Sequence, residues 1–134
     1  MNWKLIIGLS LLGLAMAFAT VFFVPATVEP VCWLVVFVVY AYLIARARSS
    51  GQFLHGFLLG LVNCAWVTGA HMVFFERYLA KHPQEAAVMA TMPLANSPRL
   101  LMALFGPVVG IISGIVIGLL AFLAGKFVKA PGTN

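Results

Sequence analysis

Apolar residues are gathered into four long segments, and most polar residues lie between those segments. The segments run over about residues 5–24, 30–46, 53–78 and 98–128. A helix needs about 20 apolar residues to cross the hydrocarbon core of a bilayer, and the segments have about that length or more. No stretch alternates apolar and polar residues as a strand would. The pattern predicts an all-α fold, with residues 1–134 forming one transmembrane domain built as a four-helix bundle.

Prolines and one long polar connection mark the ends of these segments. Pro30 suits the first turn of the second helix. Ser97 and Pro98 suit the N-cap and the first helical position of the fourth. Residues 79–97 are predicted to form an external loop, in which the stretch after Pro83 has the composition of a short interfacial helix.

The composition places the chain in the membrane. Hydrophobic residues make up 63% of it and charged residues only 8%, whereas a soluble domain carries about 25% charged residues. The lipid bilayer is therefore the predicted partner of its surface. The net charge of +5 comes from scattered basic residues with no basic run interleaved with aromatics, so nucleic-acid binding is not predicted.

The loop charges predict the orientation. With four crossings, one side holds five basic residues and the other holds three: Lys4, Arg46, Arg48, Lys126 and Lys129 against Arg77, Lys81 and Arg99. The positive-inside rule then puts both termini in the cytoplasm. A difference of five against three leaves dual insertion open.

The fourth segment carries glycines at every fourth position, and the third segment carries a matching pair. These are Gly106, Gly110, Gly114 and Gly118, with Gly56 and Gly60 opposite them. Small residues let transmembrane backbones approach closely, so these glycines are predicted to be helix-packing positions. The contact is either within one chain or between copies in a homo-oligomer. Pro107, inside the fourth segment, is predicted to kink the helix.

Polar side chains on the third segment are the candidates for function. Asn63, Thr68 and His71 are the candidate contacts to a pathway or ligand. The alternative for Asn63 is an interhelical hydrogen bond, and the alternative for His71 is a satisfied residue near the interface. The chain contains no Asp and no convergent acid, base and nucleophile, so an enzyme is not predicted.

No metal or cofactor site is predicted. Cys32 and Cys64 do not form a CxxC pair, and His55 and His71 are about 24 Å apart along one helix. The external His82, with Glu85 and Glu76, gives only loosely spaced ligands.

Two stretches carry a resemblance: "FLHGFLLGLVNCAWVTGAHMVFFERYLAKHPQEAAVMATMP" and "SPRLLMALFGPVVGIISGIVIGLLAFLAGK". Over them the chain resembles a family of small four-helix bacterial inner-membrane proteins of unknown function. The resemblance implies a multi-pass protein of the bacterial inner (plasma) membrane. It implies no activity and no functional residues.

Two functions follow from these observations. The first is a non-enzymatic structural or accessory membrane protein that associates through its glycine-bearing helix. The alternative is an oligomeric channel or passive transporter for ions or small solutes, with Asn63, Thr68 and His71 facing the pathway. The sequence identifies no small-molecule ligand.

Overall fold

The computed structural model describes residues 1–128, and this part of the chain contains six α-helices and no strand. The all-α prediction is confirmed, and four of the helices are long and apolar enough to cross a membrane. These four are α1 (Trp3–Phe22), α2 (Glu29–Ala47), α3 (Gln52–Val73) and α6 (Pro98–Ala124), and the two short helices are α4 (Phe75–Lys81) and α5 (Pro83–Thr91).

The helix ends differ from the predicted ones at two places. The third apolar segment, predicted to run to residue 78, divides at Phe74, where α3 ends and α4 begins. Hydropathy did not reveal this break because Phe75 and Tyr78 are buried in α4 and prolong the apolar run. α5 lies within the predicted loop, where the short helix expected after Pro83 is confirmed. α6 ends at Ala124, earlier than predicted, and the Ser97 side chain makes no capping hydrogen bond.

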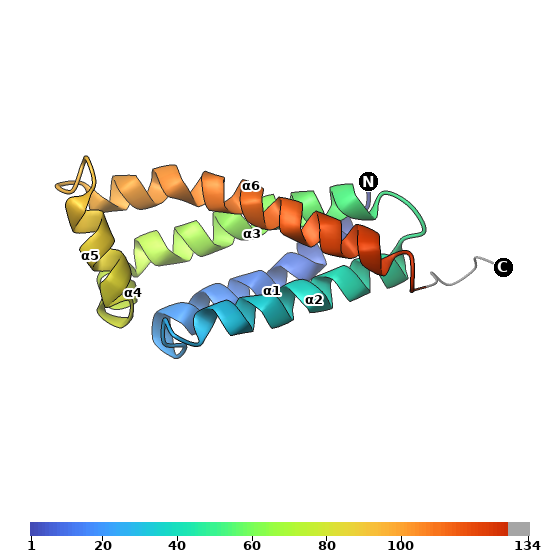
Figure 1. Cartoon of the computed structure of the whole chain (residues 1–134), viewed down its shortest axis with the longest axis horizontal. Helices are drawn as coiled ribbons and strands as arrows, with labels where there is room; N and C mark the ends of the chain where they lie inside the picture. The colour runs from blue at the N-terminus through green and yellow to red at the C-terminus, as the bar shows by residue number, and fades with distance from the viewer. Residues whose placement is uncertain (129–134) are drawn as a thin grey trace.

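The long helices run side by side as one bundle (Figure 1), in which α1 packs mainly against α3 and α2 mainly against α6, whereas α1 and α2 contact each other little. α1 and α2 diverge from α3 and α6 toward the end where α4 and α5 lie (Figure 1). The most extensive packing in the structure is between α3 and α6, and α6 also packs against α2.

Two apolar clusters hold the bundle together. The larger lies among the long helices and includes Ile6, Tyr40, Ile44, Leu59 and Ile117, each at most 1% exposed. The smaller lies beside α4 and is built from Val21, Phe75, Tyr78 and Met102. Many leucines and valines on the outer faces are exposed, as expected for helices in contact with lipid.

Glycines on α3 and α6 bring the two backbones into direct contact. A Cβ atom placed on Gly56 would lie 2.7 Å from the Cα of Gly118, and one placed on Gly60 would overlap the Cα of Gly114. A Cβ on Gly114 would lie 2.7 Å from the carbonyl oxygen of Phe57. Neither backbone has room for a larger side chain at these positions.

The same contact continues toward α4 with small side chains on α3. Gly110 faces Cys64, Gly106 faces Thr68, and the Cys64 thiol donates a hydrogen bond to the Gly106 carbonyl at 3.0 Å. α6 continues without a break through Pro107. The helix curves along its length (Figure 1), and a kink at the proline stays a prediction. The predicted packing glycines therefore lie against α3 of the same chain.

Alanine at Gly114 should destabilise the protein. Its Cβ must push against the Phe57 carbonyl, and overpacking of this kind costs about 1–3 kcal/mol. Gly69→Ala is the control, because a Cβ there has no atom within 4 Å and alanine favours helix. The free energy of unfolding in lipid micelles checks both variants. Equal stabilities for the two variants would contradict the backbone contact.

Candidate ligand-binding cavity

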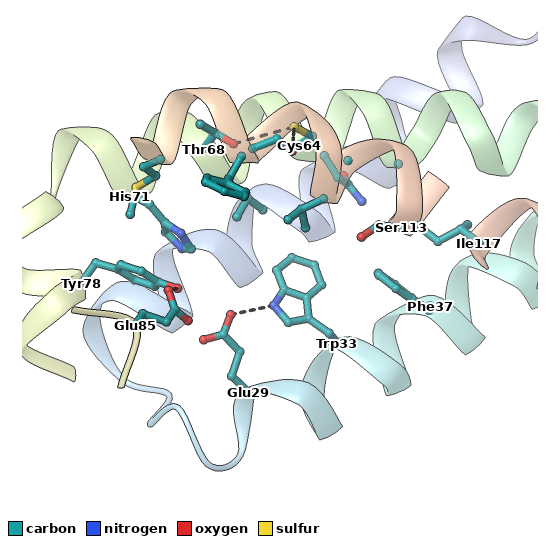
Figure 2. Close-up of a pocket in the computed structure, with 18 of the residues that line it drawn as sticks. Glu29, Trp33, Phe37, Cys64, Thr68, His71, Tyr78, Glu85, Ser113 and Ile117 are labelled. Atoms are coloured by element: carbon teal, nitrogen blue, oxygen red, sulfur yellow. Dashed lines mark hydrogen bonds between the residues drawn. The ribbon is translucent and has the colours of Figure 1, made fainter. Parts of the chain in front are cut away.

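A cavity of about 520 Å³ lies between α2, α3 and α6, with α4 and α5 at one end. Its walls include Trp33 and Phe37 from α2, Val67 from α3, and Phe105 and Val109 from α6. Figure 2 shows the labelled side chains around this space. The volume lies within the range of about 300–1,000 Å³ that small-molecule sites have.

Three of the packing glycines form part of the cavity wall. Gly60, Gly106 and Gly110 line the cavity, and they place no side chain in it. Toward the N-terminal end of the bundle, the buried side chains of Tyr40, Ile44 and Ile117 belong to the same apolar cluster. Since Ile117 also lines the cavity, its side chain marks where the cavity meets the packed core.

Polar side chains from α1 to α5 gather at the other end, beside α4 and α5. We call them the polar cluster: Thr20, Glu29, Trp33, His71, Tyr78, His82 and Glu85. Four of them, Thr20, His71, Tyr78 and His82, are at most 6% exposed. The cluster connects α1, α2, α3 and the α4–α5 segment by hydrogen bonds and ring stacking.

One proton is shared between His82 and Glu29. The His82 Nδ1 lies 2.8 Å from the Tyr78 carbonyl oxygen, which only accepts, so Nδ1 carries a hydrogen. The His82 Nε2 lies 2.6 Å from the Glu29 Oε2, and one hydrogen must lie between them. The pair is therefore either imidazolium with carboxylate or imidazole with carboxylic acid, and both forms have no net charge. The other Glu29 oxygen accepts from the Trp33 indole at 3.0 Å (Figure 2).

Hydrogen bonds also fix the tautomer of His71. The Thr20 hydroxyl donates to the Ala17 carbonyl at 2.9 Å, so its oxygen accepts from the His71 Nε2 at 3.0 Å. The neutral ring then has its lone pair on Nδ1. This ring stacks on Tyr78 with 3.8 Å between centroids, and Tyr78 stacks on His82 at 4.0 Å.

Tyr78 lies at the centre of the polar cluster. Its hydroxyl donates to the Glu85 Oε2 at 2.8 Å. Burial raises the pKa of Tyr78, and the negative charges of Glu85 and Glu29 and the hydrogen bond to Glu85 raise it further. The neutral hydroxyl is therefore the form that the fold favours.

The structure brings the three predicted contact residues, Asn63, Thr68 and His71, to the wall of one cavity. Asn63 differs from the other two, because its amide lies against Gly13 of α1. Neither amide atom has a hydrogen-bond partner among the described residues, and the same holds for the buried Tyr40 hydroxyl. The interhelical hydrogen bond suggested for Asn63 does not appear within these residues.

Glu29, Trp33 and Tyr78 were not predicted from the sequence to be site residues. A signal was present, since Glu29 and Trp33 are four residues apart, as are Tyr78 and His82, and this spacing brings side chains together on a helix. The pairing of Glu29 with His82 crosses 53 positions, and no local pattern could indicate it.

His55, which lies away from both the cavity and the polar cluster, has a structural role. His55 accepts from the Asn2 backbone amide at 3.1 Å through Nε2 and donates to the Gly51 carbonyl at 2.8 Å through Nδ1. Within residues 1–128, no group of three His, Cys, Asp or Glu residues is arranged to hold a metal ion.

Comparisons with protein-family models, with curated proteins and with solved structures find no match to this chain.

Tyr78 should make the protein less stable as the solution becomes alkaline. Above about pH 10 the unfolded chain loses this proton and the folded chain keeps it, so stability falls by up to about 1.4 kcal/mol per pH unit. Tyr78→Phe should therefore show a shallower loss of unfolding free energy between about pH 10 and 11. Tyr42→Phe, at an exposed position, is the control. Identical slopes for wild type and Tyr78→Phe would contradict the buried position of this hydroxyl.

Proposed function

We propose that this integral membrane protein is a non-enzymatic binding protein that holds a small amphipathic molecule in the cavity between α2, α3 and α6. The observation that carries the proposal is the cavity itself, whose wall is mostly apolar between α2, α3 and α6 and is polar where it meets Glu29, Tyr78 and Glu85. A molecule with an apolar body and a polar head matches both parts of this surface.

Binding accounts for the polar cluster better than catalysis does. Glu29, Tyr78 and His82 bond to one another or to neighbouring side chains, and these bonds connect α2 with the α4–α5 segment. Among the described residues, the hydroxyl and thiol groups here are held by backbone carbonyls: the Cys64 thiol donates to Gly106, and the Thr20 hydroxyl beside His71 donates to Ala17.

The arrangement of the core favours binding over conduction. A channel within one chain needs a continuous path, and the cavity meets packed side chains near Tyr40, Ile44 and Ile117. The backbone contact between α3 and α6 also occupies Gly114 and Gly118, so association of copies through these glycines would require the contact to open. In the proposed orientation, with both termini in the cytoplasm of a bacterial inner membrane, the polar end of the cavity faces outward.

A photoreactive neutral amphiphile tests whether the cavity binds a ligand. Octanol carrying a diazirine should label cavity residues such as Trp33, Tyr78 and Met102 in nanodiscs, and this labelling should saturate as its concentration rises. Ser113→Phe places a ring in the cavity from a half-buried position and should reduce saturable labelling about tenfold. Mass spectrometry of peptides locates the adducts.

Ile112→Phe is the matched control, because residue 112 precedes Ser113 and is 58% exposed on the outer face of α6. It should leave the cavity labelling unchanged. Labelling confined to outward-facing residues, or labelling that rises linearly without saturation in wild type, would overturn the proposal.

A further inference from the structure

We propose that the molecule held in the cavity is an amphiphilic monovalent cation, with a protonated amine at the polar end and an apolar body along α3 and α6. This inference rests on the proposed function, because it assigns the chemical class of the ligand in that same cavity.

The charged side chains around the cavity favour an occupant with one positive charge. Among the described residues that line it, Glu29 and Glu85 are the only charged side chains. Glu29 shares its proton with His82, so that pair has no net charge, and the His82 ring does not line the cavity. Glu85 is exposed at this end of the cavity, accepts a hydrogen bond from the Tyr78 hydroxyl and forms no ion pair within residues 1–128. An occupant with a single positive charge could pair with its carboxylate.

The polar groups at this end that are free to form a hydrogen bond are acceptors, because the donor groups already bond to protein side chains. The Trp33 indole donates to Glu29, and the Tyr78 hydroxyl donates to Glu85. His71 is only 6% exposed, and its Nδ1 lone pair has no partner among the described residues. Glu85 also keeps one carboxylate oxygen without a hydrogen bond there. A ligand group that donates hydrogen bonds therefore matches this end better than one that accepts them.

A phosphate-bearing lipid head does not suit the same place. Within the described part of the chain, no Lys or Arg lines the cavity to pair with a phosphate. The nearby Arg77 and Arg99 place their guanidinium groups over the rings of Phe22 and Phe75, at 5.1 and 5.3 Å. A phosphate would instead lie beside the Glu85 carboxylate, and like charges repel each other.

The rest of the cavity fits an apolar body. From His71 to Gly60 it follows twelve residues of α3, which are eleven steps of 1.5 Å, or about 16 Å along the helix axis. Val67 and Val109 line this stretch, and the ring of Trp33 stands beside the polar end, where an aromatic face attracts a cation (Figure 2). An aliphatic chain or a flat apolar scaffold matches this length.

Competition against the neutral photolabel tests the charge of the ligand. Decylamine, decanol and decanoate have similar chains and, near pH 7, carry a positive, a neutral and a negative head. In nanodiscs of zwitterionic lipid, decylamine should suppress labelling of Trp33 at a concentration about tenfold below that of decanol, with decanoate weaker still. Suppression by decanol or decanoate at the same concentration as decylamine would overturn the charge assignment and leave cavity binding intact.

Two glutamine variants locate the charge. Glu85→Gln should remove most of the preference for decylamine, and its unchanged labelling by the neutral probe shows that the cavity still forms. Glu76→Gln is the matched control, since that side chain is 87% exposed and does not line the cavity. It should keep the full preference. Equal preferences in the two variants would contradict the role of Glu85.

Discussion

The rest of the structure depends on the contact between the backbones of α3 and α6. In a bilayer, replacing the lipid around a helix by the apolar side chains of another helix lowers the free energy only a little. Helices therefore associate where their surfaces can approach closely. Gly56 and Gly60 meet Gly118 and Gly114 with no room for a Cβ atom between them. Glycine does not disrupt the helical conformation here, because the backbone N–H and C=O groups in lipid must form their hydrogen bonds within the helix. The low helix propensity of glycine in water therefore counts for little here.

This contact has two consequences for the site. It makes α3 and α6 one unit, against which α1 packs mainly through α3 and α2 mainly through α6. It also forms part of the cavity wall, since Gly60, Gly106 and Gly110 line the cavity of about 520 Å³.

The polar cluster connects the helices at the end of the bundle beside α4 and α5. Burying Glu29 and His82 apart from each other would carry a large desolvation cost, and their short contact offsets it. The stacked rings of His71, Tyr78 and His82 connect α3 to the α4–α5 segment. The same groups give the cavity its polar end, so the ordering of this end and its capacity to bind a polar head come from one set of contacts.

The features of the structure that depend on local sequence pattern could be predicted. Segment length and hydropathy were sufficient for the four long helices, and the spacing from Gly106 to Gly118 indicated a packing surface. The division at Phe74 was missed because the aromatic residues Phe74, Phe75 and Tyr78 continue the hydrophobic segment past it. His71 was recognised as a candidate because it is polar within an apolar run. Glu29 was not recognised, because its partner His82 comes from a distant part of the chain.

Solid-state NMR of the protein in lipid bilayers, with ¹³C at the glycine Cα atoms, tests the central contact most directly. The account predicts through-space cross peaks between Gly60 and Gly114 and between Gly56 and Gly118. Because the contact is within one chain, their relative intensity should be unchanged when labelled protein is diluted with unlabelled protein. Absence of these cross peaks, or their loss on dilution, would contradict the account.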